Sequence, residues 1–304
     1  MKTFLPTAFL KWKFIPFSEA NISIATHALH YWTWAFGWMR AFPNPKNSSE
    51  ILLFRPKNHA KRLSNSAKIL WYDLSAEYIE EKIFEFIKLN KPTKPIYIRP
   101  LVYTSDLDIT PRLYDIEKDF LIYWLELWDY LPSGEWVTCT ISSYRRQSDV
   151  SFPLRGKITW WYITSALAKA EAHERWFDEA IMLNDKNKVS EWTGMNIFIV
   201  KNGKIITPWV TQDILEWITR DSVMKLAKYL WYEVEEREVD KSELFLADEV
   251  FLTWTAARVT AVSKIEQFNL PKNKPIFSAL KENFEKLVRW EIKEFKDFVV
   301  WVEI

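Results

Sequence analysis

The sequence has a single cysteine, few glycines and no long apolar run. Cys139 alone cannot form an intramolecular disulfide and offers no cysteine cluster for a metal. No apolar run approaches the roughly 20 residues that a membrane-spanning helix needs. The formal net charge is only +1, so no overall field would attract nucleic acid or an anionic membrane. Residues 1–17 are interrupted by lysine and proline and lack a cleavage site. We therefore expect a soluble, cytoplasmic protein.

Glycine is the most informative shortage. The chain has 5 glycines and 18 tryptophans among 304 residues, and the two types together approach the usual glycine share of about 7%. Trp176 and Trp231 follow helical runs, where a chain usually enters the left-handed region on a glycine. Trp12 lies between two lysines. We hypothesise that some or all tryptophans are glycines in the natural product, through a genetic code that reads UGA as glycine. The alternative is a truly tryptophan-rich protein.

Strand and helix patterns alternate along the whole chain, which indicates a two-domain α/β (α+β) protein. We expect a smaller α+β N-terminal domain over residues 1–132, a linker over 133–147 and a larger C-terminal domain over 148–304. Helices are predicted over 57–70, from a Ser75 cap to residue 89, over 163–175 and over 220–230. Asn202-Gly203 predicts a hairpin between strands at 196–200 and 204–207.

Several short motifs could carry chemistry. Lys157 stands beside small and aromatic residues just before a helical run, and a neutral lysine amine can attack a carbonyl. Three turns, at 190–194, 215–220 and 253–257, become glycine turns with a hydroxyl residue if each tryptophan is glycine. Such turns expose backbone N–H groups that can cradle a phosphate, although ordinary loops are at least as probable for each. The four histidines have no other potential ligand residues near them at the spacing of a metal site, so we expect no metal site.

Taken in order, these motifs resemble the fold-type IV pyridoxal-phosphate aminotransferases, the fold of D-amino-acid aminotransferase. They are most similar to the branched-chain amino-acid aminotransferases. The matching runs are residues 27–40, 97–100, 157–162, 191–198, 214–221, 247–250 and 253–257. Tryptophan stands where the family places glycine in each motif that contains one.

The resemblance implies a pyridoxal 5'-phosphate cofactor. Lys157 would form the Schiff base and move a proton between substrate and cofactor, while Glu191 would pair with the pyridine nitrogen. Tyr162 would hydrogen-bond the phenolic oxygen of the cofactor. The residues that would bind its phosphate are Arg62, Ile218, Thr219 and Thr255.

The resemblance also implies the substrates. The chain would move the amino group of L-leucine, L-isoleucine or L-valine to 2-oxoglutarate, and it would act as a homodimer or higher homo-oligomer. The residues that would form the substrate site are Tyr31, Phe36, Arg40, Tyr97, Arg99, Tyr130, Thr255 and Ala256. A homologous D-amino-acid aminotransferase or aminodeoxychorismate lyase would share Lys157 and Glu191, so these activities stay open as alternatives.

The chain departs from the family at its tryptophans. Trp160, Trp192, Trp217 and Trp254 adjoin assigned cofactor or substrate groups, where an indole would fill the site or force a bulky residue into left-handed backbone. If these tryptophans are real, the chain would be a catalytically inactive relative. Gly37 also stands where many relatives carry glutamate.

Overall fold

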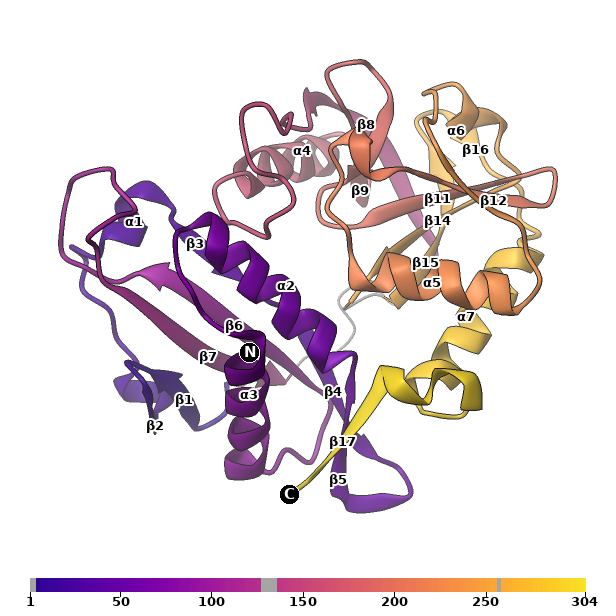
Figure 1. Cartoon of the computed structure of the whole chain (residues 1–304). Helices are drawn as coiled ribbons and strands as arrows, with labels where there is room; N and C mark the ends of the chain where they lie inside the picture. The colour runs from indigo at the N-terminus through magenta and orange to yellow at the C-terminus, as the bar shows by residue number, and fades with distance from the viewer. Residues whose placement is uncertain (1–3, 127–135, 256–257) are drawn as a thin grey trace. The chain divides into compact units, whose positions relative to one another are not determined.

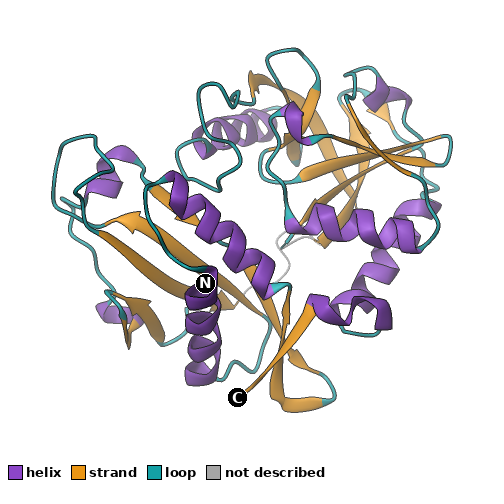
Figure 2. Ribbon diagram, viewed as in Figure 1, coloured by secondary structure: helices purple, strands orange, loops and turns teal. Residues whose placement is uncertain are grey.

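A computed structural model describes residues 4–126, 136–255 and 258–304. The chain divides into two compact units (Figure 1). Unit 1 comprises Met1–Trp128, Gly156–Trp160 and Leu287–Ile304, and unit 2 comprises Asp129–Arg155 and Trp161–Lys286. Both units combine helices with a sheet, as Figure 2 shows, in agreement with the predicted mixed architecture.

Unit 1 is built on an antiparallel sheet in the order β17-β5-β4-β6-β7-β1-β2, with β3 paired to β6. Its strands are β1 (Thr7–Leu10), β2 (Lys13–Pro16), β3 (Trp34–Phe36), β4 (Met39–Asn44), β5 (Asn47–Phe54), β6 (Ile96–Thr104), β7 (Lys118–Glu126) and β17 (Val299–Glu303). A short helix, α1 (His27–Tyr31), precedes β3.

Two longer helices, α2 (Pro56–Ile69) and α3 (Ala76–Asn90), lie on one face of this sheet (Figures 1 and 2). The apolar stripe of α3 is fully buried, because its apolar residues recur at helical spacing. Ser75 caps α3, as predicted, by accepting a hydrogen bond from the Tyr78 N–H at 3.1 Å.

Unit 2 contains a mixed sheet in the order β10-β9-β8-β15-β14-β11-β12-β13, with β16 paired to β15. Its strands are β8 (Trp136–Arg145), β9 (Glu179–Leu183), β10 (Val189–Trp192), β11 (Asn196–Lys201), β12 (Lys204–Pro208), β13 (Val234–Arg237), β14 (Glu249–Trp254), β15 (Arg258–Ile265) and β16 (Phe268–Asn269). Its helices are α4 (Tyr162–Glu174), α5 (Ile218–Tyr229), α6 (Glu243–Leu246) and α7 (Pro275–Val288), whose last two residues belong to unit 1. The predicted hairpin at Asn202-Gly203 joins β11 to β12.

The division into units differs from the predicted domain boundaries. Most of the expected linker, residues 133–147, belongs to β8, whose alternate residues Val137, Cys139 and Ile141 are buried. Residues of β17, expected in the C-terminal domain, pair with β5 in unit 1. Threonine and serine alternate with apolar residues over this segment, which is the pattern of a half-buried strand and is inconsistent with a linker.

Three helices end in the same backbone motif, with tryptophan at the left-handed position. The N–H groups of Trp71, Trp176 and Trp231 bond to the carbonyls three residues earlier, at 3.0 Å in each case. The next N–H reaches back five residues in all three, which completes a Schellman motif. Their φ angles are 56°, 62° and 64°. The expectation of left-handed backbone at Trp176 and Trp231 is therefore confirmed. None of the helices among the described residues has both the length and the apolar character to cross a membrane.

Candidate functional site

The backbone of Lys157 is held between β3 and α2 in unit 1. The Phe36 N–H donates to the Lys157 carbonyl at 3.0 Å, and the Lys157 N–H donates to Ser66 Oγ at 2.9 Å. The preceding residue, Gly156, has little room for a side chain, because a Cβ placed there would lie 2.6 Å from Cδ1 of Ile69. The position of the lysine is therefore fixed by a strand on one side and a helix on the other.

The Lys157 side chain is fully buried among aromatic rings. Its Nζ lies 4.6 Å from the ring centroid of Phe36 and 5.1 Å from that of Trp38. The Arg99 guanidinium lies over the same two rings, at 4.7 Å and 4.6 Å. Aromatic faces stabilise cations at such distances. Two cationic side chains thus share one aromatic wall, which makes this part of unit 1 suited to an anionic group.

Other predicted substrate residues adjoin this cluster. Arg99 Nη2 donates to the Tyr97 hydroxyl at 3.2 Å, and Arg40 lies opposite Tyr97 in the β4–β6 pairing. Arg40 is buried, with its guanidinium 4.8 Å from the ring centroid of Phe42. These contacts bring five predicted residues, Phe36, Arg40, Tyr97, Arg99 and Lys157, into one connected group in unit 1.

A buried histidine, His59, shows that positive charge gathers beside this group. Its Nδ1 lies 3.5 Å from Nη2 of Arg62. Burial lowers the pKa of His59 well below its ordinary value, and the charges of Arg62, Arg55 and Lys157 lower it further. The histidine is therefore neutral at physiological pH among three cations. Such a concentration of positive charge favours binding of a phosphate or carboxylate.

Glu191 is the centre of the corresponding cluster in unit 2. The residue lies on β10 and is completely buried. Its Oε1 lies 2.8 Å from Arg146 Nη2. Its Oε2 accepts hydrogen bonds at 3.1 Å each from Asn196 Nδ2, the Leu215 N–H and the Trp217 indole Nε1. A buried carboxylate requires partners of this kind to offset the loss of its hydration.

Arg146 is a site residue that the sequence reasoning missed. Its Nε donates to the Asp213 carbonyl at 3.0 Å, and its guanidinium lies 3.9 Å from the ring centroid of Trp161. Trp161 in turn stacks on Tyr162 at 3.9 Å between centroids. The sequence gives no means of choosing Arg146 over Arg145, because the two arginines are adjacent at the end of one strand.

The N-terminus of α5 adjoins the Glu191 cluster. Ile218 and Thr219 are its first residues, both buried, and their position exposes N–H groups of the kind that bind anions. Trp217 occupies the N-cap with no capping bond from its side chain. Its indole is 1% exposed and donates to Glu191. The structure therefore links the predicted residues Glu191, Tyr162, Ile218 and Thr219 through three residues, Arg146, Trp161 and Trp217.

Two predicted residues, Tyr31 and Thr255, are not connected to either cluster by the described contacts. Tyr31 donates its hydroxyl to the Ile109 carbonyl, and its ring lies 4.7 Å from that of His27. Thr255, half-buried, directly follows β14. Tyr130 and Ala256 lie outside the described residues.

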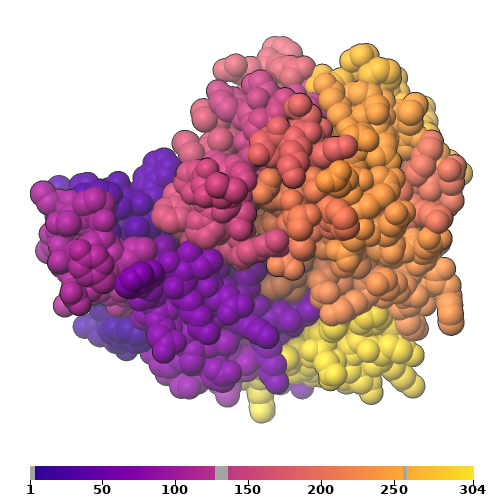
Figure 3. Space-filling model, turned by 45° about the horizontal axis from the view of Figure 1, so that its top comes forward, coloured from indigo at the N-terminus to yellow at the C-terminus, as the bar shows by residue number. Residues whose placement is uncertain are grey.

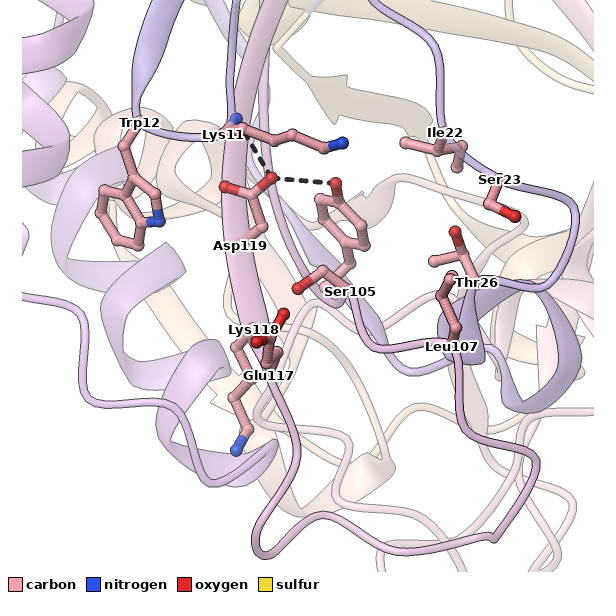
Figure 4. A pocket seen from close by; sticks show the side chains of 11 residues that line it. Lys11, Trp12, Ile22, Ser23, Thr26, Ser105, Leu107, Glu117, Lys118 and Asp119 are labelled. Carbon is pink, nitrogen blue, oxygen red and sulfur yellow. Dashed lines mark hydrogen bonds between the residues drawn. The ribbon is translucent and has the colours of Figure 1, made fainter.

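A separate pocket in unit 1 contains none of the predicted site residues. Figure 4 shows Asp119 in its wall, accepting hydrogen bonds from the Lys11 N–H at 3.1 Å and the Tyr103 hydroxyl at 3.0 Å. Burial raises the pKa of the Asp119 carboxyl. Trp12 also lines this pocket. One bond to Asp119 comes from the turn that follows β1 and the other from β6, so the carboxyl has a structural role in joining them to β7.

The chain that carries these clusters is similar, over most of its length, to known proteins of one family. The family description "Amino-transferase class IV" matches residues 39–265. A "Probable branched-chain-amino-acid aminotransferase" of Synechocystis sp. is 54% identical over 299 residues, covering 98% of both chains. The branched-chain aminotransferase of Thermoproteus uzoniensis, solved with norvaline, has a TM-score of 0.93 at 31% identity, covering 99% of this chain and 100% of that one. The enzyme of Thermobaculum terrenum in its PLP-form has a TM-score of 0.93 at 29% identity, covering 99% of each chain.

Proposed function

Because this chain belongs to the class IV aminotransferases, we propose that it moves the amino group of L-leucine, L-isoleucine or L-valine to 2-oxoglutarate. The observation that carries the proposal is the fully buried Lys157, whose Nζ shares the rings of Phe36 and Trp38 with Arg99. A lysine amine placed in this way can act as a nucleophile toward a carbonyl, and an adjacent arginine can bind a substrate carboxylate.

The remaining predicted residues have proposed roles on the same basis. Tyr97 orients Arg99 through their hydrogen bond, and the apolar ring of Phe36 would face an aliphatic side chain. A wall of this kind distinguishes one methylene by only about 1–3 kcal/mol, so all three branched-chain substrates are expected to react. Tyr31, Arg40, Tyr130, Thr255 and Ala256 are proposed to complete the substrate site. We further propose that the protein acts in the cytoplasm and that it forms a homodimer. Light scattering, which gives the molar mass in solution, tests the oligomeric state.

Pyridoxal phosphate is the cofactor of class IV aminotransferases, and it supplies an electron sink when bound. The donor groups present suit it: Lys157 for its aldehyde, Glu191 for its ring nitrogen, Tyr162 for its phenolic oxygen. Arg62, Ile218, Thr219 and Thr255 are the groups proposed for its phosphate. The Trp217 side chain does not suit it, because its indole donates to the Glu191 oxygen at 3.1 Å where the ring nitrogen would bind. With Trp217 in place, no catalytic step through the cofactor follows.

The test uses protein isolated from its natural host, assayed for amino transfer to 2-oxoglutarate from L-leucine and from D-alanine. We expect transfer from L-leucine, L-isoleucine and L-valine. A preference for D-alanine would instead support the homologous D-amino-acid aminotransferase. Borohydride treatment followed by peptide mass mapping should place a covalent cofactor label on Lys157. The absence of any amino transfer by the host protein would refute the proposal.

A further inference from the structure

Six tryptophans among the described residues stand in left-handed backbone, where a bulky side chain is unfavourable. They are Trp12, Trp32, Trp71, Trp176, Trp231 and Trp290, with φ between 55° and 65°. L-residues pay about 1–2 kcal/mol to enter this region, and bulky residues are outliers there. Glycine enters it without that cost. Tryptophan therefore gathers where backbone geometry selects glycine.

At Trp176 and Trp231, burial of the indole does not compensate for this backbone cost. Trp176 is 94% exposed and Trp231 is 95% exposed. Each follows a helix cap in a complete Schellman motif, and glycine is the usual residue at that position. The backbone bonds of the motif need no side chain at all. A large apolar group in open solvent thus gains nothing from its position in this fold.

Trp217 gives a second, independent observation, because its backbone is not left-handed. Its φ is −76° and ψ is 139°, as expected for an N-cap, where glycine is accepted and large apolar residues are not. The side chain fills the space between the start of α5 and Glu191, and presents an aromatic N–H to the carboxylate at 3.1 Å. A pyridinium ring would present the same chemistry: a flat aromatic ring with an N–H directed at a buried carboxylate.

We propose that the Trp217 indole stands in the place of the cofactor ring, and that position 217 and the six left-handed tryptophan positions carry glycine in the protein that its host makes. Glycine at 217 would open a space bounded by the Glu191 carboxylate and the N–H groups of Ile218 and Thr219. That space offers a partner for a ring nitrogen at one side and for a phosphate at the other. The inference rests on the proposed function only for the identity of this ring.

The first test is peptide sequencing of the natural protein across residues 215–219 and across the ends of α2, α4 and α5. We expect glycine at 217, 71, 176 and 231. Tryptophan at these positions would overturn the proposal. This readout is independent of activity, so glycine at 217 without amino transfer would refute the proposed function alone. Tryptophan at 217 with amino transfer would refute the present inference alone.

The second test compares two recombinant proteins. Both carry glycine at the six left-handed positions and at Trp160, Trp192 and Trp254, whose indoles also adjoin assigned groups. One has Trp217→Gly in addition, and the other retains Trp217. Equilibrium dialysis with pyridoxal phosphate should show at least tenfold weaker binding when Trp217 is retained. A third protein carries Trp217→Phe in the same background, which keeps an aromatic ring without its N–H, and it should also bind weakly. Equal binding by all three proteins would show that the ring does not use this space, and would overturn the proposal. Circular dichroism checks that each protein is folded.

Discussion

Two hairpins of this molecule have the same geometry and different residues. In unit 2, Asn202 and Gly203 join β11 to β12, with φ of 50° and 77°. In unit 1, Lys11 and Trp12 join β1 to β2, with φ of 51° and 65°. Both are two-residue loops with positive φ at both positions, which is the type I′ turn that selects Asn-Gly. The backbone thus adopts the same turn twice, and only the hairpin in unit 2 has the Asn-Gly pair that suits this turn.

Strand register can impose a turn against the preference of its residues. The pairing of Leu10 with Lys13 leaves two residues for the loop, as the pairing of Lys201 with Lys204 does. Strand pairing on a right-handed twist admits few two-residue turns. A residue that does not suit the backbone conformation of its turn therefore lowers the free energy of unfolding, and this decrease can be measured.

The largest expected effect concerns the three helix ends at which tryptophan stands in left-handed backbone. Replacing Trp71, Trp176 and Trp231 together by glycine should raise the free energy of unfolding by about 3 kcal/mol, at about 1 kcal/mol per left-handed position. Denaturant unfolding with an unchanged m-value measures the gain. The matched control places alanine at the same three positions, which removes each indole and keeps each Cβ. An equal gain from alanine would show that the indoles, and not the backbone, were the cause.

The next effect is the converse change in the hairpin that suits its turn. Gly203→Trp should lower the free energy of unfolding by about 1–2 kcal/mol, because a Cβ then enters left-handed backbone. Gly203→Asn should cost less, since asparagine tolerates this region. The space beside Gly203 is open, with no atom within 4 Å of a Cβ placed there. If Gly203→Trp were neutral, steric cost in the turn could not explain the difference between the hairpins.

A smaller gain is expected from Trp12→Gly, at most about 1 kcal/mol. Trp12 is half-exposed and its ring centroid lies 5.8 Å from that of Tyr78, so glycine loses this contact while it relieves the turn. Thermal unfolding of Trp12→Gly beside Trp12→Ala separates the two contributions. The glycine variant should be the more stable of the two; the reverse order would contradict the role of the turn.

The smallest expected effect is a difference between the two units in how their stability depends on pH. The pKa of His59 lies well below 6.5 in folded unit 1, so the unfolded chain binds a proton there first as the pH falls. This contribution to stability is present in full above pH 6.5 and is lost between 6.5 and the lower folded pKa. Amide exchange protection at Trp12, in unit 1, should therefore fall more in this window than protection at Gly203, in unit 2. His59→Asn should remove the difference; persistence of the difference would assign it to another group.

Local sequence patterns predicted much of the fold. The Ser75 cap, the apolar stripe of α3 and the Asn202-Gly203 turn depend on residues near each other in the chain, and all three are present. The pairing of β17 with β5 depends on residues about 250 apart in sequence, and no local periodicity specifies such a partner. The pairing of residues 299–303 with a strand of unit 1 was not predicted for this reason.

The candidate site shows the same limit. The sequence indicated Lys157, Arg99 and Glu191, because their motifs resemble those of a known family. It gave no indication of Arg146, since burial under Trp161 and pairing with Glu191 arise only when β8, β10 and α4 come together. The effect of Trp217 was partly foreseen: its indole fills the space at Glu191, and its backbone does not enter the left-handed region.

The pairing of β17 with β5 also sets an order of completion during synthesis. The strands of unit 2 all lie between residues 136 and 269, so its sheet can be complete before residues 299–303 leave the ribosome. Unit 1 begins first and finishes last, because the edge of β5 stays unpaired until then. A nascent chain would therefore expose the unpaired edge of β5 until residues 299–303 are available to pair with it.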